Sequence, residues 1–158
     1  MKLQILNGNV WALAKPTDYV VIPTNIGWKT NGCNVMGRGL AQQAARLCPE
    51  LPERYGEYCQ LARENTAVVI MNKRYILFPT KPLHIERPYF SWKFCSSLEL
   101  IERSLKELVE ILPVLPKNRR VLITDVGCGN GGLSTADVRP LLEKYLWPFP
   151  SIRLVILE

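Results

Sequence analysis

Two short glycine-dense segments are the parts of this chain best suited to chemistry. They are residues 34–41 (NVMGRGLA) and residues 126–133 (VGCGNGGL). Glycine reaches left-handed backbone conformations and lets a ligand come close to the backbone amides. Each segment lies between an apolar run and a helix-like pattern, so open N–H groups at a helix N-terminus are expected just beyond it. Two such loops predict a diphosphate held between them, and hence a nucleotide-like ligand.

Length, composition and charge limit the class of protein. The chain has 158 residues, 47% apolar and 22% charged, so residues 1–158 are expected to form a single domain with a true core. No apolar run approaches the length of a membrane span, and the start of the chain does not resemble a signal peptide. A cytoplasmic protein without a membrane partner is therefore expected. The formal charge of +6 fits either simple solubility or an anionic partner, a phosphate-bearing small molecule or nucleic acid.

Cysteine and histidine do not form a metal-binding pattern. The five cysteines are widely spaced, none forms a Cys-x-x-Cys pair, and His84 is the one histidine. Neither a structural zinc site nor a disulfide scaffold is expected, and no cofactor is expected either.

Hydrophobic patterns predict strands that alternate with helices. Pro23 and Pro79 are expected to end their strands, and residues 80–94 form a long polar and aromatic loop of a length typical of functional segments. The fold class is therefore α/β, with a largely parallel or mixed sheet between helices and both glycine loops at its carboxyl edge, where ligands bind. Strands are expected at 3–6, 19–23, 67–71, 75–78, 121–123 and 152–157, and helices at 39–47, 53–64, 97–112 and from 134 to about 147.

Two common explanations of a glycine loop do not fit this chain. A methyltransferase cofactor loop follows the first strand of its fold, whereas residues 121–131 are followed by one helix and one strand only. A phosphate-binding P-loop closes with Gly-Lys-Ser/Thr, which neither segment contains.

Taken together, the two loops resemble the ligand loops of macrodomains, which bind ADP-ribose. Residues 21–27 with 35–41 resemble the first loop, and residues 127–133 resemble the second, which cradles the diphosphate. The likeness extends from the opening Asn7-Gly8-Asn9-Val10 to the last strand. Residues 75–81 (YILFPTK) are similar to the subgroup that contains the DarG-like DNA ADP-ribosyl glycohydrolases of bacteria and the terminal ADP-ribose glycohydrolase of animals. The resemblance implies a three-layer α/β/α macrodomain with a central mixed, mostly parallel sheet.

The resemblance also implies a catalytic role for Lys81 at the anomeric carbon of the distal ribose. A neutral Lys81 would attack that carbon, and a protonated Lys81 would stabilise a leaving phosphate; the sequence does not choose between them. His84 is the weaker catalytic candidate, because imidazole titrates near neutral pH. Asp125 could line the pocket or form a salt bridge. An aromatic residue of the long loops, such as Tyr89 or Trp92, could stack on a base.

Ligand contacts are expected from the start of the chain, from both loops and from the residue before Lys81. Asn9 stands where many macrodomains have the aspartate that meets the adenine amino group, and its carbonyl can still accept a hydrogen bond. Asn130 stands where the animal enzyme has an aspartate. The bacterial branch lacks that aspartate, as this chain does. The expected ligand-binding residues are Asn9, Asn25, Gly37, Arg38, Gly39, Thr80, Gly127, Cys128, Gly129, Asn130, Gly131, Gly132 and Leu133.

The resemblance implies an ADP-ribosyl glycohydrolase that removes ADP-ribose from nucleic acid or from protein. Two alternatives stay open, a phosphatase acting on ADP-ribose 1″-phosphate and a non-catalytic ADP-ribose reader. The expected partner is ADP-ribose or an ADP-ribosylated substrate. Nucleic acid and a cognate ADP-ribosyltransferase toxin are further partners that the sequence leaves open.

Overall fold

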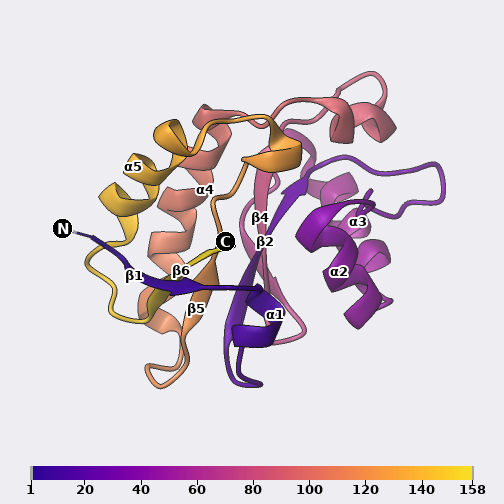
Figure 1. The fold of residues 1–158 in the computed structure, drawn as a ribbon. Coiled ribbons are helices and arrows are strands. Elements are labelled where there is room, and N and C mark those ends of the chain that lie inside the picture. Colours follow the sequence, from indigo (N-terminus) through magenta and orange to yellow (C-terminus); the bar gives the residue numbers. More distant parts are fainter. Residues whose placement is uncertain (1, 158) are drawn as a thin grey trace.

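A six-stranded sheet with helices on both faces forms the centre of the computed structural model, which describes residues 2–157 (Figure 1). The strand order is β1-β6-β5-β2-β4-β3, and every neighbouring pair is parallel except β3 with β4. The predicted mixed, mostly parallel sheet is therefore confirmed. The strands are β1 (Gln4–Asn7), β2 (Tyr19–Asn25), β3 (Val69–Met71), β4 (Tyr75–Lys81), β5 (Val121–Ile123) and β6 (Ile152–Ile156).

The helices bury one apolar layer on each face of the sheet. Successive residues of a strand point to opposite faces, so Val21 of β2 packs into the layer under α4 and α5, and Val20 into the layer under α1, α2 and α3. Both valines are fully buried, and each such side chain stabilises the fold by about 1.5–3 kcal/mol. The three-layer α/β/α arrangement is confirmed. The helices are α1 (Val10–Leu13), α2 (Gly39–Leu47), α3 (Leu51–Ala62), α4 (Leu98–Ile111) and α5 (Thr135–Leu146).

The expectation that two prolines end their strands is wrong. β2 continues through Pro23 to Asn25, and β4 continues through Pro79 to Lys81. Proline lacks an N–H, but the N–H positions of Pro23 and Pro79 face β5 and β3, whose pairing has already ended there. The two longer strands end as a register pair, Asn25 opposite Lys81, at the carboxyl edge of the sheet. Both side chains are thereby placed at the same end of the fold.

The short elements that were not predicted include one helix and one 3₁₀ turn near the expected site. The four-residue helix α1 follows Asn9, and a 3₁₀ turn (Pro88–Lys93) lies inside the segment expected as a loop. Both are too short to give a periodic apolar pattern.

No helix within residues 2–157 is both long enough and apolar enough to cross a bilayer.

A buried ion pair joins β5 to the start of β2. Arg120 donates to both carboxylate oxygens of Asp18, at 3.1 Å and 2.6 Å, and the Lys15 amide donates to the same group at 2.7 Å. Asp18 is 1% exposed. Burial alone would raise the pKa of this carboxyl, but the hydrogen bonds and the Arg120 charge outweigh it and hold the pKa below its ordinary value near 3.8.

Replacing Asp18 with asparagine is expected to lower the free energy of unfolding by about 1–3 kcal/mol at neutral pH, because Arg120 loses its charged partner. A carboxyl with a lowered folded-state pKa stabilises the fold above its unfolded pKa, and that contribution fades as the pH falls through the folded value. The gap between wild type and Asp18→Asn should therefore narrow below about pH 4. Urea midpoints at neutral and acid pH measure the difference in stability between the two proteins. A difference that does not change with pH would mean that lost packing, and not lost charge, causes it.

Candidate functional site

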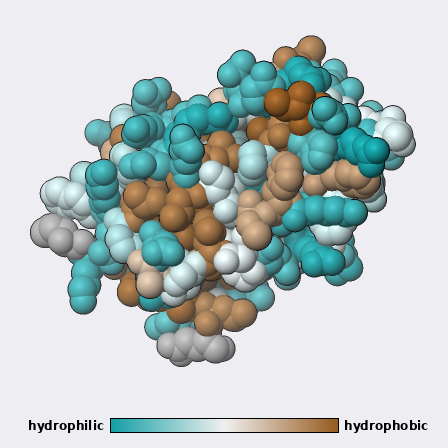
Figure 2. Space-filling view, turned by 90° about the horizontal axis from the view of Figure 1, so that it is seen from above, coloured by the Kyte–Doolittle hydropathy of each residue, from teal (hydrophilic) through white to brown (hydrophobic). Residues whose placement is uncertain are grey.

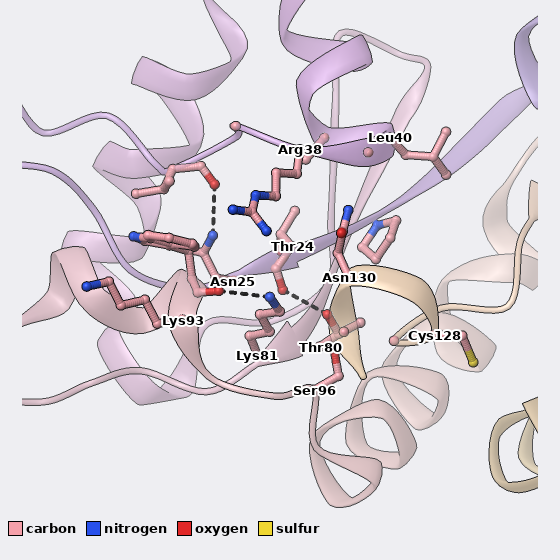
Figure 3. A pocket seen from close by; sticks show the side chains of 18 of the residues that line it. Thr24, Asn25, Arg38, Leu40, Thr80, Lys81, Lys93, Ser96, Cys128 and Asn130 are labelled. Atoms are coloured by element: carbon pink, nitrogen blue, oxygen red, sulfur yellow. Dashed lines mark hydrogen bonds between the residues drawn. The ribbon is translucent and has the colours of Figure 1, made fainter. Parts of the chain in front are cut away.

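A cavity of about 620 Å³ opens at the carboxyl edge of the sheet, within the size range of small-molecule sites. Figure 2 looks onto this side of the molecule from above, where hydrophobic surface lies between hydrophilic margins. The ends of β2 and β4, both glycine loops and the segment after β4 line the cavity (Figure 3).

The first glycine loop brings the open start of α2 to the cavity. Arg38 occupies the N-cap position, and its side chain makes no capping hydrogen bond. The first N–H groups of a helix have no acceptor within the helix, and those of Gly39, Leu40 and Ala41 belong to residues that line the cavity. This end of α2 therefore offers several donors and the positive end of the helix dipole to an anion.

The second glycine loop lies opposite and is held by its neighbours. Gly127 has a φ of +81°, and a Cβ there would lie 2.6 Å from Ile101 Cδ1. A Cβ on Gly131 would lie 2.4 Å from Ser96 Oγ, so the second loop packs closely against Ser96 at this position. The side-chain amide of Asn130 reaches to 3.6 Å from the Cβ position of Gly39, which shows that the two loops meet across the cavity.

An asparagine pair fixes the wall between the loops. Asn25 donates from Nδ2 to the Val35 carbonyl at 2.8 Å, and its Oδ1 accepts from the Gly27 amide at 3.1 Å. Asn34 Nδ2 lies 3.1 Å from the same Oδ1 and donates to the Gly27 carbonyl at 2.8 Å. Asn25 is therefore held rigidly while still lining the cavity.

Lys81 ends β4 with its side chain directed into the cavity, beside Asn25 (Figure 3). Its Nζ donates to the Trp92 carbonyl at 2.8 Å. Burial lowers the pKa of Lys81, and the nearby positive charge of Arg38 lowers it further. Both effects raise the fraction of neutral amine, which is the nucleophilic form.

Curated proteins are similar in sequence to this chain over most of its length. No model of a known protein family matches the chain. The DNA ADP-ribosyl glycohydrolase of Thermus aquaticus is 26% identical over 164 positions, which cover 99% of this chain and 41% of the relative. That of Mycobacterium tuberculosis is 28% identical over 134 positions, covering 80% and 36%. The chain thus spans about two fifths of the length of these curated relatives.

The solved macrodomain of Mycobacterium tuberculosis DarG superposes with a TM-score of 0.74 at 26% identity, over 98% of this chain and 95% of that one. The chain is a DarG-like macrodomain. Agreement over nearly the whole of both folds confirms the expected architecture.

Most of the predicted site residues of this macrodomain do meet at the cavity. The lining includes Asn25, Gly37, Arg38, Gly39, Thr80, Lys81, Gly127, Cys128, Asn130 and Gly131. The lining does not include Asn9, His84, Gly129, Gly132 or Leu133.

Asn9 and His84 are both engaged elsewhere. Asn9 Oδ1 caps α1 by accepting from the amides of Trp11 and Ala12 at 2.9 Å and 3.3 Å. That carbonyl is the group expected to meet an adenine, so the contact would have to be shared with the cap. His84 stacks on Phe94 at 5.5 Å, and its Nδ1 accepts from the Arg87 amide. Neither side chain reaches the cavity in this structure.

Two further candidates line the cavity in forms unsuited to proton transfer or nucleophilic attack. Asp125 receives two hydrogen bonds from Arg139, at 3.0 Å and 2.8 Å, so its carboxylate is a salt-bridge partner. Burial raises the pKa of the Cys128 thiol, and the Asp125 charge raises it further. The thiolate is therefore disfavoured.

Sequence reasoning missed several lining residues, of which Thr24, Lys93, Ser96 and Thr124 are the polar ones. Ser96 is 5% exposed, and its Oγ has no partner within residues 2–157. Its place beside Gly131 results from a contact between distant segments, for which the sequence carries no local signal. Among those same residues, no group of three His, Cys, Asp or Glu side chains could hold a metal ion.

Proposed function

We propose that this macrodomain binds ADP-ribose and hydrolyses the bond between its distal ribose and a substrate. The arrangement of the cavity carries the proposal. Open amide donors at one wall face a lysine of lowered pKa at the other, and a rigid asparagine stands beside that lysine.

The two loops are suited to hold the diphosphate. The start of α2 supplies backbone donors, the second loop closes from the other side, and Arg38 adds a positive charge. The unpartnered hydroxyl of Ser96 is a buried polar group that a bound ligand can satisfy. With the diphosphate between the loops, the distal ribose lies towards Asn25 and Lys81.

Lys81 then acts on the anomeric carbon. Its neutral Nζ attacks with the lone pair, and the bond from that carbon to the substrate breaks with its electron pair. One proton of the amine passes to the leaving group. Water next replaces the nitrogen, so that its hydroxyl joins the carbon and its proton returns to Nζ. Because the bound ribose would be held next to Lys81, the attack becomes effectively unimolecular, which raises its rate.

DNA is the substrate that we propose. The relatives from Thermus aquaticus and Mycobacterium tuberculosis are named DNA ADP-ribosyl glycohydrolases, and the formal charge of +6 suits a polyanion. Action in the cytoplasm and a cognate toxin partner stay predictions of the sequence.

The test is to incubate the protein with ADP-ribosylated single-stranded DNA, with ADP-ribosylated protein and with ADP-ribose 1″-phosphate, and to follow product release. We expect free ADP-ribose and unmodified DNA. Phosphate release alone would assign the cavity to a phosphatase. No turnover on any substrate, with ADP-ribose still bound in calorimetry, would leave a reader.

A further inference from the structure

The segment that follows Lys81, residues 82–94, is called the mouth loop below, and it exposes an unusual amount of aromatic and apolar surface. Ile85 is 65% exposed, Tyr89 is 44% exposed and Phe94 is 38% exposed. Side chains of this kind normally pack inside a fold, so a cluster of them at the surface indicates a contact.

Aromatic rings and cations alternate through the mouth loop. His84 lies parallel to Phe94 at 5.5 Å, and Phe90 meets both His84 and Tyr89 edge to face. Lys93 Nζ lies 4.3 Å from the centre of the Phe90 ring, and the Arg87 guanidinium lies 5.6 Å from it. The rings and cations of the mouth loop thus contact one another in the structure.

This cluster is continuous with the cavity. Tyr89, Trp92 and Lys93 belong to the mouth loop and also line the cavity. Arg38 lies over the Trp92 ring at 5.4 Å, so the row of rings and cations reaches from the proposed diphosphate site to the outer surface. Lys81, which marks the end of the cavity where the scissile bond would lie, donates to the Trp92 backbone.

We propose that the mouth loop binds the single-stranded nucleic acid on either side of the modified nucleotide, with bases stacked on Phe94 and Tyr89 and phosphates near Arg87 and Lys93. This inference rests on the proposed function, because it assumes that the ADP-ribose in the cavity is attached to that strand. Stacked bases and a cationic track are the two features by which proteins hold single strands without reading their sequence.

The chemistry of the surface favours a single strand over other partners. A duplex hides the faces of its bases, so exposed rings gain little from it. The mouth loop contains two cations, Arg87 and Lys93, against the single carboxylate of Glu86, and that balance suits a polyanion better than a peptide of mixed charge.

The test compares wild type with an Arg87→Ala/Phe94→Ala double variant in fluorescence anisotropy on unmodified, labelled single-stranded DNA. We expect the double variant to bind about tenfold or more weakly, and the wild-type affinity to fall with salt more steeply than that of the variant. Phe94→Tyr, which keeps a stacking ring, should retain binding. Equal binding by wild type and double variant would overturn the proposal.

A matched control removes similar side chains from the other edge of the sheet. Val114 is 79% exposed, and both Val114 and Lys117 lie in the connection before β5, so Val114→Ala/Lys117→Ala should bind DNA as wild type does. Equal loss in this control would also overturn the proposal.

Turnover separates this inference from the proposed function. The Arg87→Ala/Phe94→Ala variant should have a higher KM than wild type for an ADP-ribosylated oligonucleotide. Its KM and kcat for the ADP-ribosylated nucleoside alone should equal those of wild type. If no substrate is cleaved, the proposed function fails. The anisotropy result still shows whether the mouth loop binds single-stranded DNA. A defect seen only with ADP-ribosylated peptide would assign the mouth loop to protein instead.

Discussion

Replacing Lys81 with alanine is expected to lower kcat for release of ADP-ribose by a factor on the order of 10³ or more, while ADP-ribose still binds. Nζ is the amine that lines the cavity beside Asn25, and its pKa is lowered by burial and by Arg38. Affinity should survive because the diphosphate donors belong to the backbone at the start of α2 and in the second loop. Single-turnover kinetics with calorimetry measure both effects.

Lys81→Arg is the matched control for this prediction. Arginine keeps the positive charge and can still donate to the Trp92 carbonyl, but it cannot become a neutral nucleophile. We expect Lys81→Arg to be as inactive as Lys81→Ala. Substantial activity in Lys81→Arg would mean that position 81 acts as a cation, and nucleophilic attack by the amine would have to be abandoned.

The pH profile of the wild type follows from the same lysine. The neutral amine increases as the pH rises, so kcat/KM should rise through the pKa of Lys81, which lies below its ordinary value of 10.5. Arg38→Gln removes one of the two causes of that shift and should move this rising limb to higher pH. If the rising limb of the Arg38→Gln profile lies at the same pH as that of wild type, burial alone lowers the pKa of Lys81.

The fold class and most of the cavity lining could be predicted because both depend on local patterns. Apolar runs alternate with helical stripes, and glycines lie where a loop must come close to a ligand. Pro23 was misjudged because the missing N–H matters only where a neighbouring strand pairs, and the end of that pairing is a property of the sheet. The side-chain carbonyl of Asn9 was expected to meet the ligand, because the four-residue helix α1 that it caps was not predicted.

The contacts that hold the cavity residues in place were the part of the site least predictable from the sequence. The Thr24 hydroxyl meets the Tyr55 hydroxyl at 2.8 Å across 31 residues of chain, and the Lys81 amine meets the Trp92 backbone. Contacts of this kind are set by the packing of distant elements, and a single sequence does not encode them as a motif. The same holds for Ser96 against Gly131.

Replacing Gly56 with alanine is expected to lower the free energy of unfolding by about 3 kcal/mol. Gly56 is buried inside α3, where alanine would normally stabilise a helix by about 1 kcal/mol. Here the added Cβ would lie 2.0 Å from the Gly32 carbonyl oxygen and 2.5 Å from the Asn34 amide nitrogen. Both atoms are backbone, so the chain must shift to relieve the clash.

That shift should also weaken ADP-ribose binding. The Asn34 amide donates to the Pro52 carbonyl at 2.9 Å, and the Asn34 side chain holds Asn25 at the cavity. Gly37→Ala is the control for stability alone, because a Cβ there meets nothing within 4 Å and its φ is not positive, whereas its place in the cavity lining excludes it as a control for binding. Urea unfolding should separate the two variants clearly. If Gly56→Ala were as stable as wild type, the close approach of the loop to α3 would be wrong, and with it the support that Asn34 gives to Asn25.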